Sequence, residues 1–141
     1  MPYKTGEQKP IGWYLRKADQ RITDFFEEVF DRHCITRYHW MLLSAIADKE
    51  TINVKVFQPE NKYFFTPERL NGIAENLVTR GWIKAVEKDE YALTDNGKKL
   101  YNALEADYMM SLRQMMLGVT DDEYNQVVKV LDRIITNLAR R

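Results

Sequence analysis

Apolar residues recur at steps of three and four along much of the chain, the spacing that places them on one face of a helix. The first stripe runs from Ile11 to Phe30 and predicts a long amphipathic helix. The second runs from Trp40 to Ala47 and follows Thr36, whose hydroxyl can cap the start of a helix. Both helices are expected to bury one face and expose the other.

The clearest helix start lies in the middle of the chain, at Thr66-Pro67-Glu68. A hydroxyl cap, a proline at the first helical position and an acid in the first turn are each typical of a helix N-terminus. Arg80-Gly81 is expected to end this helix. The apolar positions that it should bury are Leu70, Ile73, Ala74, Leu77 and Val78.

The stretch from Thr51 to Phe65 has no clear periodicity. Its β-branched and aromatic residues fit a strand or a short helix, and Pro59 limits any helix that runs through it. We leave the type of this segment open and favour a short helix.

Two short apolar runs follow, Trp82–Val86 and Tyr91–Leu93, and the polar residues 87–90 separate them. This spacing predicts a small β-hairpin. The residues Thr94–Gly97 then open another long helix, which is expected to break at Gly118.

The last helix begins with a capping box, in which Thr120 and Glu123 can each bond the other's backbone N–H. The order of elements is therefore long helix, helix, open segment, helix, hairpin and two long helices. Its centre is a winged helix-turn-helix arrangement. The expected fold class is mainly α with a small β-hairpin wing, flanked by long helices.

Several short motifs, in this order, resemble those of the MarR family of winged helix-turn-helix transcriptional regulators. Tyr91–Gly97 resembles the family's Leu-Thr-x-x-Gly segment, and Thr120–Glu123 resembles the start of its last helix. The opening of the second helix at Ile35-Thr36 is similar as well. The segment from Thr66 to Ile83 resembles the family's recognition helix and the residues that follow it. The residues that match the family pattern are Leu77, Arg80, Gly81, Trp82 and Ile83.

The resemblance extends from Ile11 to Leu138. It implies a single MarR-like domain over residues 1–141, with the winged helix-turn-helix at 36–94. The long helices at 11–34 and 95–140 would then be dimerisation helices.

Two features depart from the family pattern. Family wings commonly carry an Asp-x-Arg-x-Arg-like tip, whereas this short hairpin offers only Lys84 and Lys88 beside acids. The helix before the recognition helix lacks the usual Glu-Leu-Ala and contains Pro59.

The resemblance implies that the helix beginning at Thr66 enters the major groove of DNA. Arginine can bond guanine and asparagine can bond adenine, while Gly72 would let the backbone approach closely. Lys84 and Lys88 are candidates for backbone phosphates, and Thr66 with the first N–H groups suits a phosphate. The alternative is an ordinary solvated helix face. The candidate DNA-binding residues are Thr66, Arg69, Asn71, Gly72, Asn76, Lys84 and Lys88, with Glu75 on the same side.

The long terminal helices carry more apolar surface than one small winged domain can cover, which favours a two-fold dimer over a helical monomer. The expected dimer contacts are Ile11, Leu15, Val127, Leu131, Ile134 and Leu138. Many family members bind a small effector, and a lipophilic or aromatic one would fit aromatic surface; plain core packing is the alternative. The candidate effector residues are Trp13, Tyr14, Trp40 and Tyr108, with Met109 and Met110 beside them.

The charge, the cysteine content and the lack of long apolar runs indicate which classes of protein fit this chain. The chain has 21 basic and 21 acidic residues, so its net charge does not by itself indicate a nucleic-acid partner. One cysteine, Cys34, cannot form an internal disulfide, which favours a reducing cytoplasm. The N-terminal residues show no apolar signal core, and no apolar run is long enough to cross a membrane.

The sequence contains no motif for phosphate, dinucleotide or nucleophilic chemistry, so we expect no enzyme and no cofactor. His33, Cys34 and His39 lack a second ligand pair with zinc spacing, so no metal site is expected either. Cys34 lies at the far end of the first helix, unlike the reactive cysteine of peroxide-sensing relatives.

Three functional hypotheses follow. The leading one is a homodimeric, sequence-specific regulator of transcription that binds double-stranded DNA, acting as a repressor that a ligand releases. The second is a dimeric winged-helix module that binds protein and has weak or no affinity for DNA; the short acidic wing and the zero net charge favour it. The third is a small-molecule-binding protein without a role on DNA.

Overall fold

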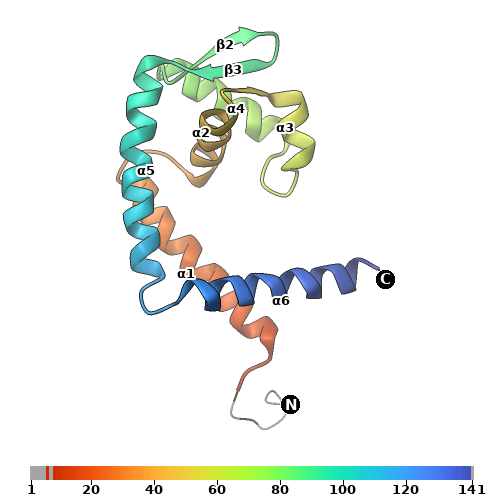
Figure 1. Ribbon diagram of the computed structural model, residues 1–141. Coiled ribbons are helices and arrows are strands. Elements are labelled where there is room, and N and C mark those ends of the chain that lie inside the picture. Colours follow the sequence, from red (N-terminus) through yellow and green to blue (C-terminus); the bar gives the residue numbers. More distant parts are fainter. Residues whose placement is uncertain (1–5, 7, 141) are drawn as a thin grey trace. The chain divides into compact units, whose positions relative to one another are not determined.

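The computed structural model describes residue 6 and residues 8–140 (Figure 1). The residues fall into two compact units, 1–109 and 110–141, which we describe separately. The sequence analysis expected no secretory signal peptide from the first six residues, and these residues lie almost entirely outside the described part of the chain. The elements in chain order are α1 (Ile11–Asp31), α2 (Arg37–Lys49), β1 (Thr51–Asn53), α3 (Val54–Glu60), α4 (Pro67–Thr79), β2 (Ile83–Glu87), β3 (Glu90–Leu93), α5 (Asp95–Met115) and α6 (Asp121–Ala139).

The helix boundaries follow the capping signals of the sequence. Before α4, the hydroxyl of Thr66 accepts a hydrogen bond from the backbone N–H of Arg69 at 3.1 Å. After α4, Gly81 adopts a positive φ of 77°, which glycine permits without strain. The Thr120–Glu123 capping box is present at the start of α6. The predicted helices and the mainly α fold class with a small β wing are confirmed.

The sheet has three antiparallel strands in the order β1-β3-β2. The hairpin of β2 and β3 is confirmed, and Asp89 in its turn has a φ of 62°. The favoured short helix is also present, as α3, and Asn53 caps it through a bond from the N–H of Lys55 at 2.9 Å. The strand that the sequence left open as the alternative is present too, as the three-residue β1 at the start of this segment. It forms because Ile52 pairs with Tyr91 of β3, a partner that local sequence does not reveal.

The core of the first unit is built around α2, which contacts α1, α4, β1 and β3. Figure 1 shows α2 lying among α3, α4 and the hairpin. The side chains of Leu42, Leu43 and Ile46 are fully buried, since apolar residues at this spacing form one inward stripe. The loop before α4 and the first strand of the hairpin supply the facing residues Phe65 and Ile83.

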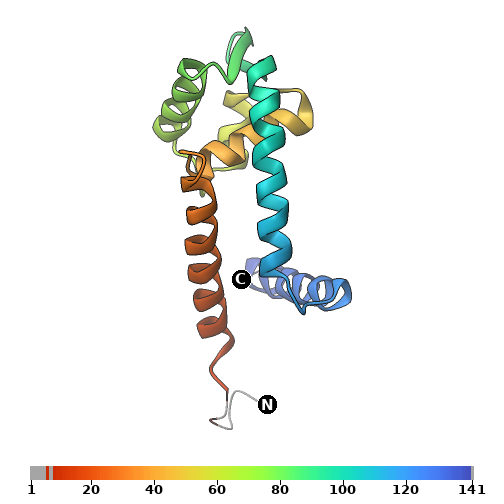
Figure 2. The same cartoon turned by 90° about the vertical axis from the view of Figure 1, so that its left-hand side faces the viewer.

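The helix α1 extends away from the winged-helix elements (Figure 2). Its C-terminal end is buried at Phe26, Val29 and Phe30, and it is tied to α5 there. The carboxylate of Asp107 accepts two bonds from Arg32 at 3.0 and 3.2 Å and lies 2.7 Å from Nε2 of His33. Hydrogen bonding by His33, followed by Arg32, lowers the pKa of Asp107 below its ordinary value.

The second unit consists mainly of α6, and no residue of this helix is buried. The apolar residues that the sequence placed on one face of this helix are not buried in it. Val127 and Leu138 are exposed, and Leu131 and Ile134 are half-buried. Among the described residues, no helix has the length and apolar character needed to cross a bilayer.

The start of α5 requires glycine at position 97, because a Cβ there would overlap the carbonyl oxygen of Trp82. The same carbonyl accepts the backbone N–H of Thr94 at 3.0 Å, and the hydroxyl of Thr94 accepts the N–H of Gly97 at 3.0 Å. These two hydrogen bonds therefore hold the first turn of α5 close to Trp82, the residue before β2.

Replacing this glycine should loosen that contact. Gly97→Ala is expected to lower the free energy of unfolding by about 1–3 kcal/mol, the usual cost of overpacking. Gly72→Ala is the matched control, because nothing lies within 4 Å of its Cβ position. At such an exposed helical position alanine should raise stability by about 0.5–1 kcal/mol. Urea titration measures both, and equal stability of the two variants would contradict the close packing of α5 on Trp82.

Candidate nucleic-acid interface

The outward face of α4 is polar and open to solvent. The helix buries Leu70, Ala74 and Leu77 against the rest of the first unit. Because successive helical residues are 3.6 to the turn, the positions opposite this stripe point directly outward. They are Glu68, Gly72, Glu75 and Thr79, all exposed. This outward face carries two carboxylates, and of the residues that the sequence placed on the DNA side it includes Gly72 and Glu75.

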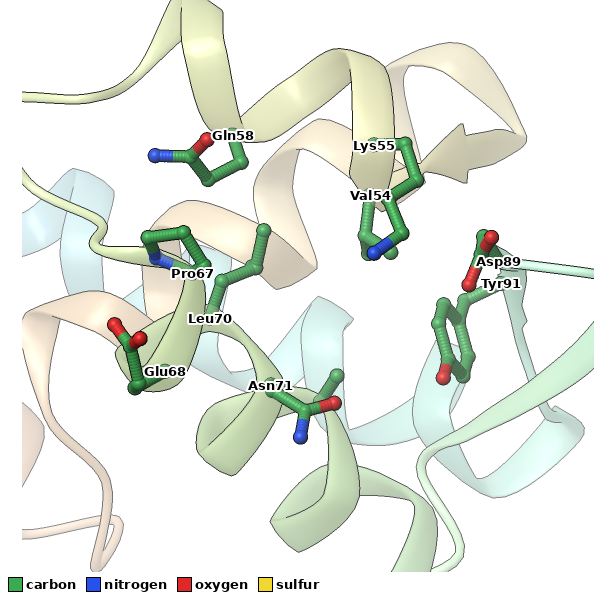
Figure 3. Close-up of a pocket in the computed structure, with 10 residues that line it drawn as sticks. Val54, Lys55, Gln58, Pro67, Glu68, Leu70, Asn71, Asp89 and Tyr91 are labelled. Atoms are coloured by element: carbon green, nitrogen blue, oxygen red, sulfur yellow. The ribbon is translucent and has the colours of Figure 1, made fainter.

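Asn71 lies on the side of α4 that faces the wing. Its Nδ2 donates to Oε1 of Glu75 at 3.4 Å, and its side chain is exposed. Figure 3 shows it at the edge of a groove of about 440 Å³ between α3, α4 and the hairpin turn. The groove is lined by Val54, Lys55, Gln58, Pro67, Glu68, Leu70, Asn71, Ala74, Asp89 and Tyr91. Lys55 is its one cation against Glu68 and Asp89, so this side of α4 is weakly acidic.

Arg69 and Asn76 lie on the opposite side of α4, toward α2. The guanidinium carbon of Arg69 lies 4.5 Å from the centre of the Tyr38 ring, and its Nη1 donates to the carbonyl of Phe64 at 2.9 Å. Oδ1 of Asn76 lies 3.0 Å from Nε2 of His39. Both residues remain exposed, but each already has a protein partner.

The two candidate lysines of the wing are exposed and lie at different places on the hairpin. Lys84 is on β2, opposite Ala92, and Lys88 is in the turn. Glu87, Asp89 and Glu90 surround Lys88 in the sequence, so the wing tip carries more negative than positive charge. Neither lysine lies with Arg69 or Asn76, which belong to the other side of α4.

His39 joins α2 to α4, a role that the sequence analysis missed. Its Nδ1 accepts the backbone N–H of Thr36 at 3.1 Å. The remaining ring proton is therefore on Nε2, which donates to Asn76. Burial lowers the pKa of His39 below its ordinary value; the Asn76 bond acts in the opposite direction, and the charge of Arg80 lowers the pKa further. The sequence signal is a Thr-x-x-His spacing at the helix start, which resembles a capping box.

The structure brings together only half of the candidate effector residues. Trp40 and Tyr108 lie 4.8 Å apart between ring centres, and both pack on Phe30; Tyr101 stacks on Trp40 at 5.4 Å. Trp13 and Tyr14 contact each other, at 5.0 Å, on the exposed N-terminal half of α1. The aromatic cluster was visible in the sequence only as separate helical positions.

Cys34 is exposed and lies in the turn that follows α1, with a positive φ of 57°. Its carbonyl accepts Nη1 of Arg80 at 2.9 Å, which links the end of α4 to the end of α1. In the part of the chain that the structure describes, no three residues of the metal-binding types come together.

The chain shares its fold with solved structures of MarR-family proteins. The reduced form of MarR from E. coli covers 93% of this chain and 97% of its own, with a TM-score of 0.72 and 17% identity. A mutant of E. coli MarR in complex with operator DNA covers 89% of this chain and 94% of its own, with a TM-score of 0.73 and 16% identity. A MarR family protein of Mycobacterium tuberculosis in complex with salicylic acid covers 90% and 99%, with a TM-score of 0.66 and 14% identity. No protein-family model matches the sequence, and no curated protein is similar to it.

The fold implied by the sequence resemblance is therefore confirmed. In this chain, the winged helix-turn-helix consists of α2 to β3, and α4 occupies the position of the helix that the resemblance assigned to DNA.

The burial of His39 should make the free energy of unfolding depend on pH, because burial lowers the pKa of the imidazole. Because the folded-state pKa is lowered, the unfolded chain binds more protons below the ordinary value of 6.5. The contribution is thus present in full above about pH 6.5 and is lost as the pH falls through the folded-state pKa. Urea titrations at about pH 7.5 and about pH 5.5 should show this loss, and His39→Gln should reduce it.

A direct readout accompanies this experiment. The imidazole protons of His39, followed by NMR in the folded protein, should titrate with a midpoint below 6.5. A midpoint at or above that value would show that the neutral tautomer bonded to Thr36 and Asn76 is not the favoured form.

Proposed function

We propose that this protein is a sequence-specific regulator of transcription that binds double-stranded DNA through α4 and represses until an effector releases it. One observation carries the proposal. On a winged-helix scaffold, α4 presents a capped N-terminus and an uncovered polar face at the place where such a scaffold meets the major groove. The complex of E. coli MarR with operator DNA, which has this fold, supports the assignment.

The residues on α4 favour readout of bases over attraction to phosphates. Asn71 can bond adenine in a bidentate manner, and Glu68 and Glu75 can accept from the amino group of cytosine. Gly72 leaves open space between them for close approach of the backbone. Carboxylates repel the phosphate backbone, so this face contributes selectivity at the expense of general affinity.

A second candidate function is favoured by the charges of the wing side. Asp89, Glu90 and Glu68 make that side unfavourable for DNA, and the chain has no net positive charge. A winged-helix module that binds another protein would not need a basic wing. The experiment below separates the two candidates.

Asn71→Ala should weaken binding to a preferred duplex by about 10- to 100-fold, because one bidentate base contact contributes roughly 1–3 kcal/mol of discrimination. The duplex is obtained by selection from a random-sequence library, and fluorescence anisotropy measures the affinity. Asn102→Ala, at an exposed position on α5, is the matched control and should bind as the unmodified protein does. Selection that enriches no sequence, with only weak binding at moderate salt, would favour the protein-binding module.

We further propose that the chain acts as a homodimer. The evidence is the unburied apolar stripe of α6, together with the exposed residues Ile11 and Leu15 on α1. An apolar stripe of this length is not expected to stay in water, since burial of each large aliphatic side chain contributes roughly 1.5–3 kcal/mol. A two-fold pair would present two copies of α4 to successive turns of one DNA face.

The dimer is tested by placing a charge in the stripe. Val127 is 57% exposed in the single chain, so Val127→Glu should leave the fold intact and give a species of 16.7 kDa in sedimentation. Gln126→Glu introduces the same carboxylate on the polar side of α6 and should remain dimeric. A sedimentation mass of 16.7 kDa for the unmodified protein at micromolar concentration would refute the dimer.

The effector is proposed to be a small aromatic or lipophilic molecule near Trp40 and Tyr108. The complex of the Mycobacterium tuberculosis protein with salicylic acid supports a ligand response on this fold. In the structure these rings pack against one another, so an effector would have to displace Phe30 or Tyr101 from the cluster. No catalytic role is proposed.

A further inference from the structure

Basic and aromatic side chains gather on the α2 side of α4. We name this surface the aromatic–basic patch; its members are Arg37, Tyr38, Lys62, Tyr63, Phe64 and Arg69. Arg37 and Tyr38 begin α2, and Arg69 lies in the first turn of α4. The other three members, residues 62–64, belong to the loop between α3 and α4. The patch therefore adjoins the N-terminus of α4 directly.

The two arginines are held in place by rings. The guanidinium carbon of Arg37 lies 5.1 Å from the centre of Tyr38 and 6.0 Å from that of Phe64. Its Nη2 also donates to the hydroxyl of Tyr38 at 3.1 Å. Arg69 covers the same tyrosine ring, at 4.5 Å. A guanidinium stacked on a ring loses little further freedom when it binds an anion, because its orientation is already restricted.

The positive charges of the patch are not neutralised by carboxylates. Within the described residues, the ion pairs closer than 4.0 Å are those of Asp107 with Arg32 and with His33. The contacts of Arg37, Lys62 and Arg69 are with aromatic rings, a hydroxyl or a carbonyl, and none of these cations forms an ion pair with a described carboxylate. Each of these cations retains N–H groups that can bind an anion.

The loop of the patch is unusually exposed for its composition. Tyr63 is 90% exposed and Phe64 is 43% exposed. The ammonium group of Lys62 lies 5.8 Å from the centre of the Tyr63 ring. Exposed rings interleaved with uncompensated cations form a surface suited to a polyanion.

We propose that the aromatic–basic patch binds the phosphate backbone of duplex DNA beside α4, so that Arg37 and Lys62 supply the salt-dependent part of the affinity. This inference rests on the proposed function. It replaces the wing lysines as the main phosphate contacts, because the wing tip and the adjoining groove are acidic whereas the patch is basic. Direct continuity with α4 favours DNA over an acidic protein surface as the occupant.

The test is the salt dependence of binding to the selected duplex. A plot of log Kd against log salt concentration should have its slope reduced by about 0.9 in Arg37→Gln and by a similar amount in Lys62→Gln. Between about 50 and about 200 mM salt, each variant should then lose roughly 3.5-fold less affinity than the unmodified protein does. Preference among duplex sequences should stay unchanged, since phosphate contacts carry no sequence information.

Lys17→Gln, at an exposed position on α1, which extends away from the winged-helix elements, is the matched control and should leave the slope unaltered. Urea titration verifies that Arg37→Gln is folded. If Arg37→Gln does not fold, Lys62→Gln still tests the inference, because Lys62 is exposed on a loop and its replacement should not disturb the fold. Slopes equal to that of the unmodified protein in both variants would overturn the inference, because neither side chain would then neutralise a phosphate. If the unmodified protein binds no duplex, the proposed function itself fails, a result distinct from unchanged slopes.

Discussion

The position of α4 depends on its attachment to α2, and His39 is central to that attachment. Its ring spans two helices: one nitrogen completes the start of α2 at Thr36, and the other holds Asn76 in the penultimate turn of α4. The Thr36 bond requires an Nδ1 without a proton, so only the neutral imidazole with its proton on Nε2 can make both bonds at once. The fully buried residues Leu42 and Leu77 supply apolar burial around it, but burial alone is not directional. The buried stripe of Leu70, Ala74 and Leu77 sets which face of α4 turns outward, and the bond from His39 adds a directional contact near the C-terminal end of the helix.

This orientation gives α4 two unlike flanks. One flank carries Asn71 and meets an acidic groove with Asp89 at its edge. The other carries Arg69 and meets Tyr38 in a region where the cations have no acidic partners at close range among the described residues. A molecule with zero net charge can therefore still offer a polyanion one favourable side. The asymmetry is a property of the tertiary structure, because both flanks come from the same 13-residue helix.

Much of the fold could be predicted because the decisive signals are local. Thr66-Pro67, Gly81 and the pair Thr120 and Glu123 act within one helical turn, and the structure uses each of them as expected. The strand β1 could only be left open as an alternative, because three residues show no period and their pairing partner lies about 40 positions away. For the candidate site, exposure along α4 followed from periodicity. Periodicity could not predict the contacts of Arg69 with Tyr38 and of Asn76 with His39, because these contacts depend on how α2 lies beside α4.

The absence of buried residues in α6 has a consequence for the energetics of the protein as a whole. Until another surface covers it, the helix is maintained by its Thr120–Glu123 cap, the three acids of its first turn and intrinsic propensity. A helix of 19 residues with only local support frays readily, and its amide protons exchange with solvent through frequent opening. In the homodimer proposed above, the partner would cover this helix, and the order of the helix would then depend on protein concentration through mass action.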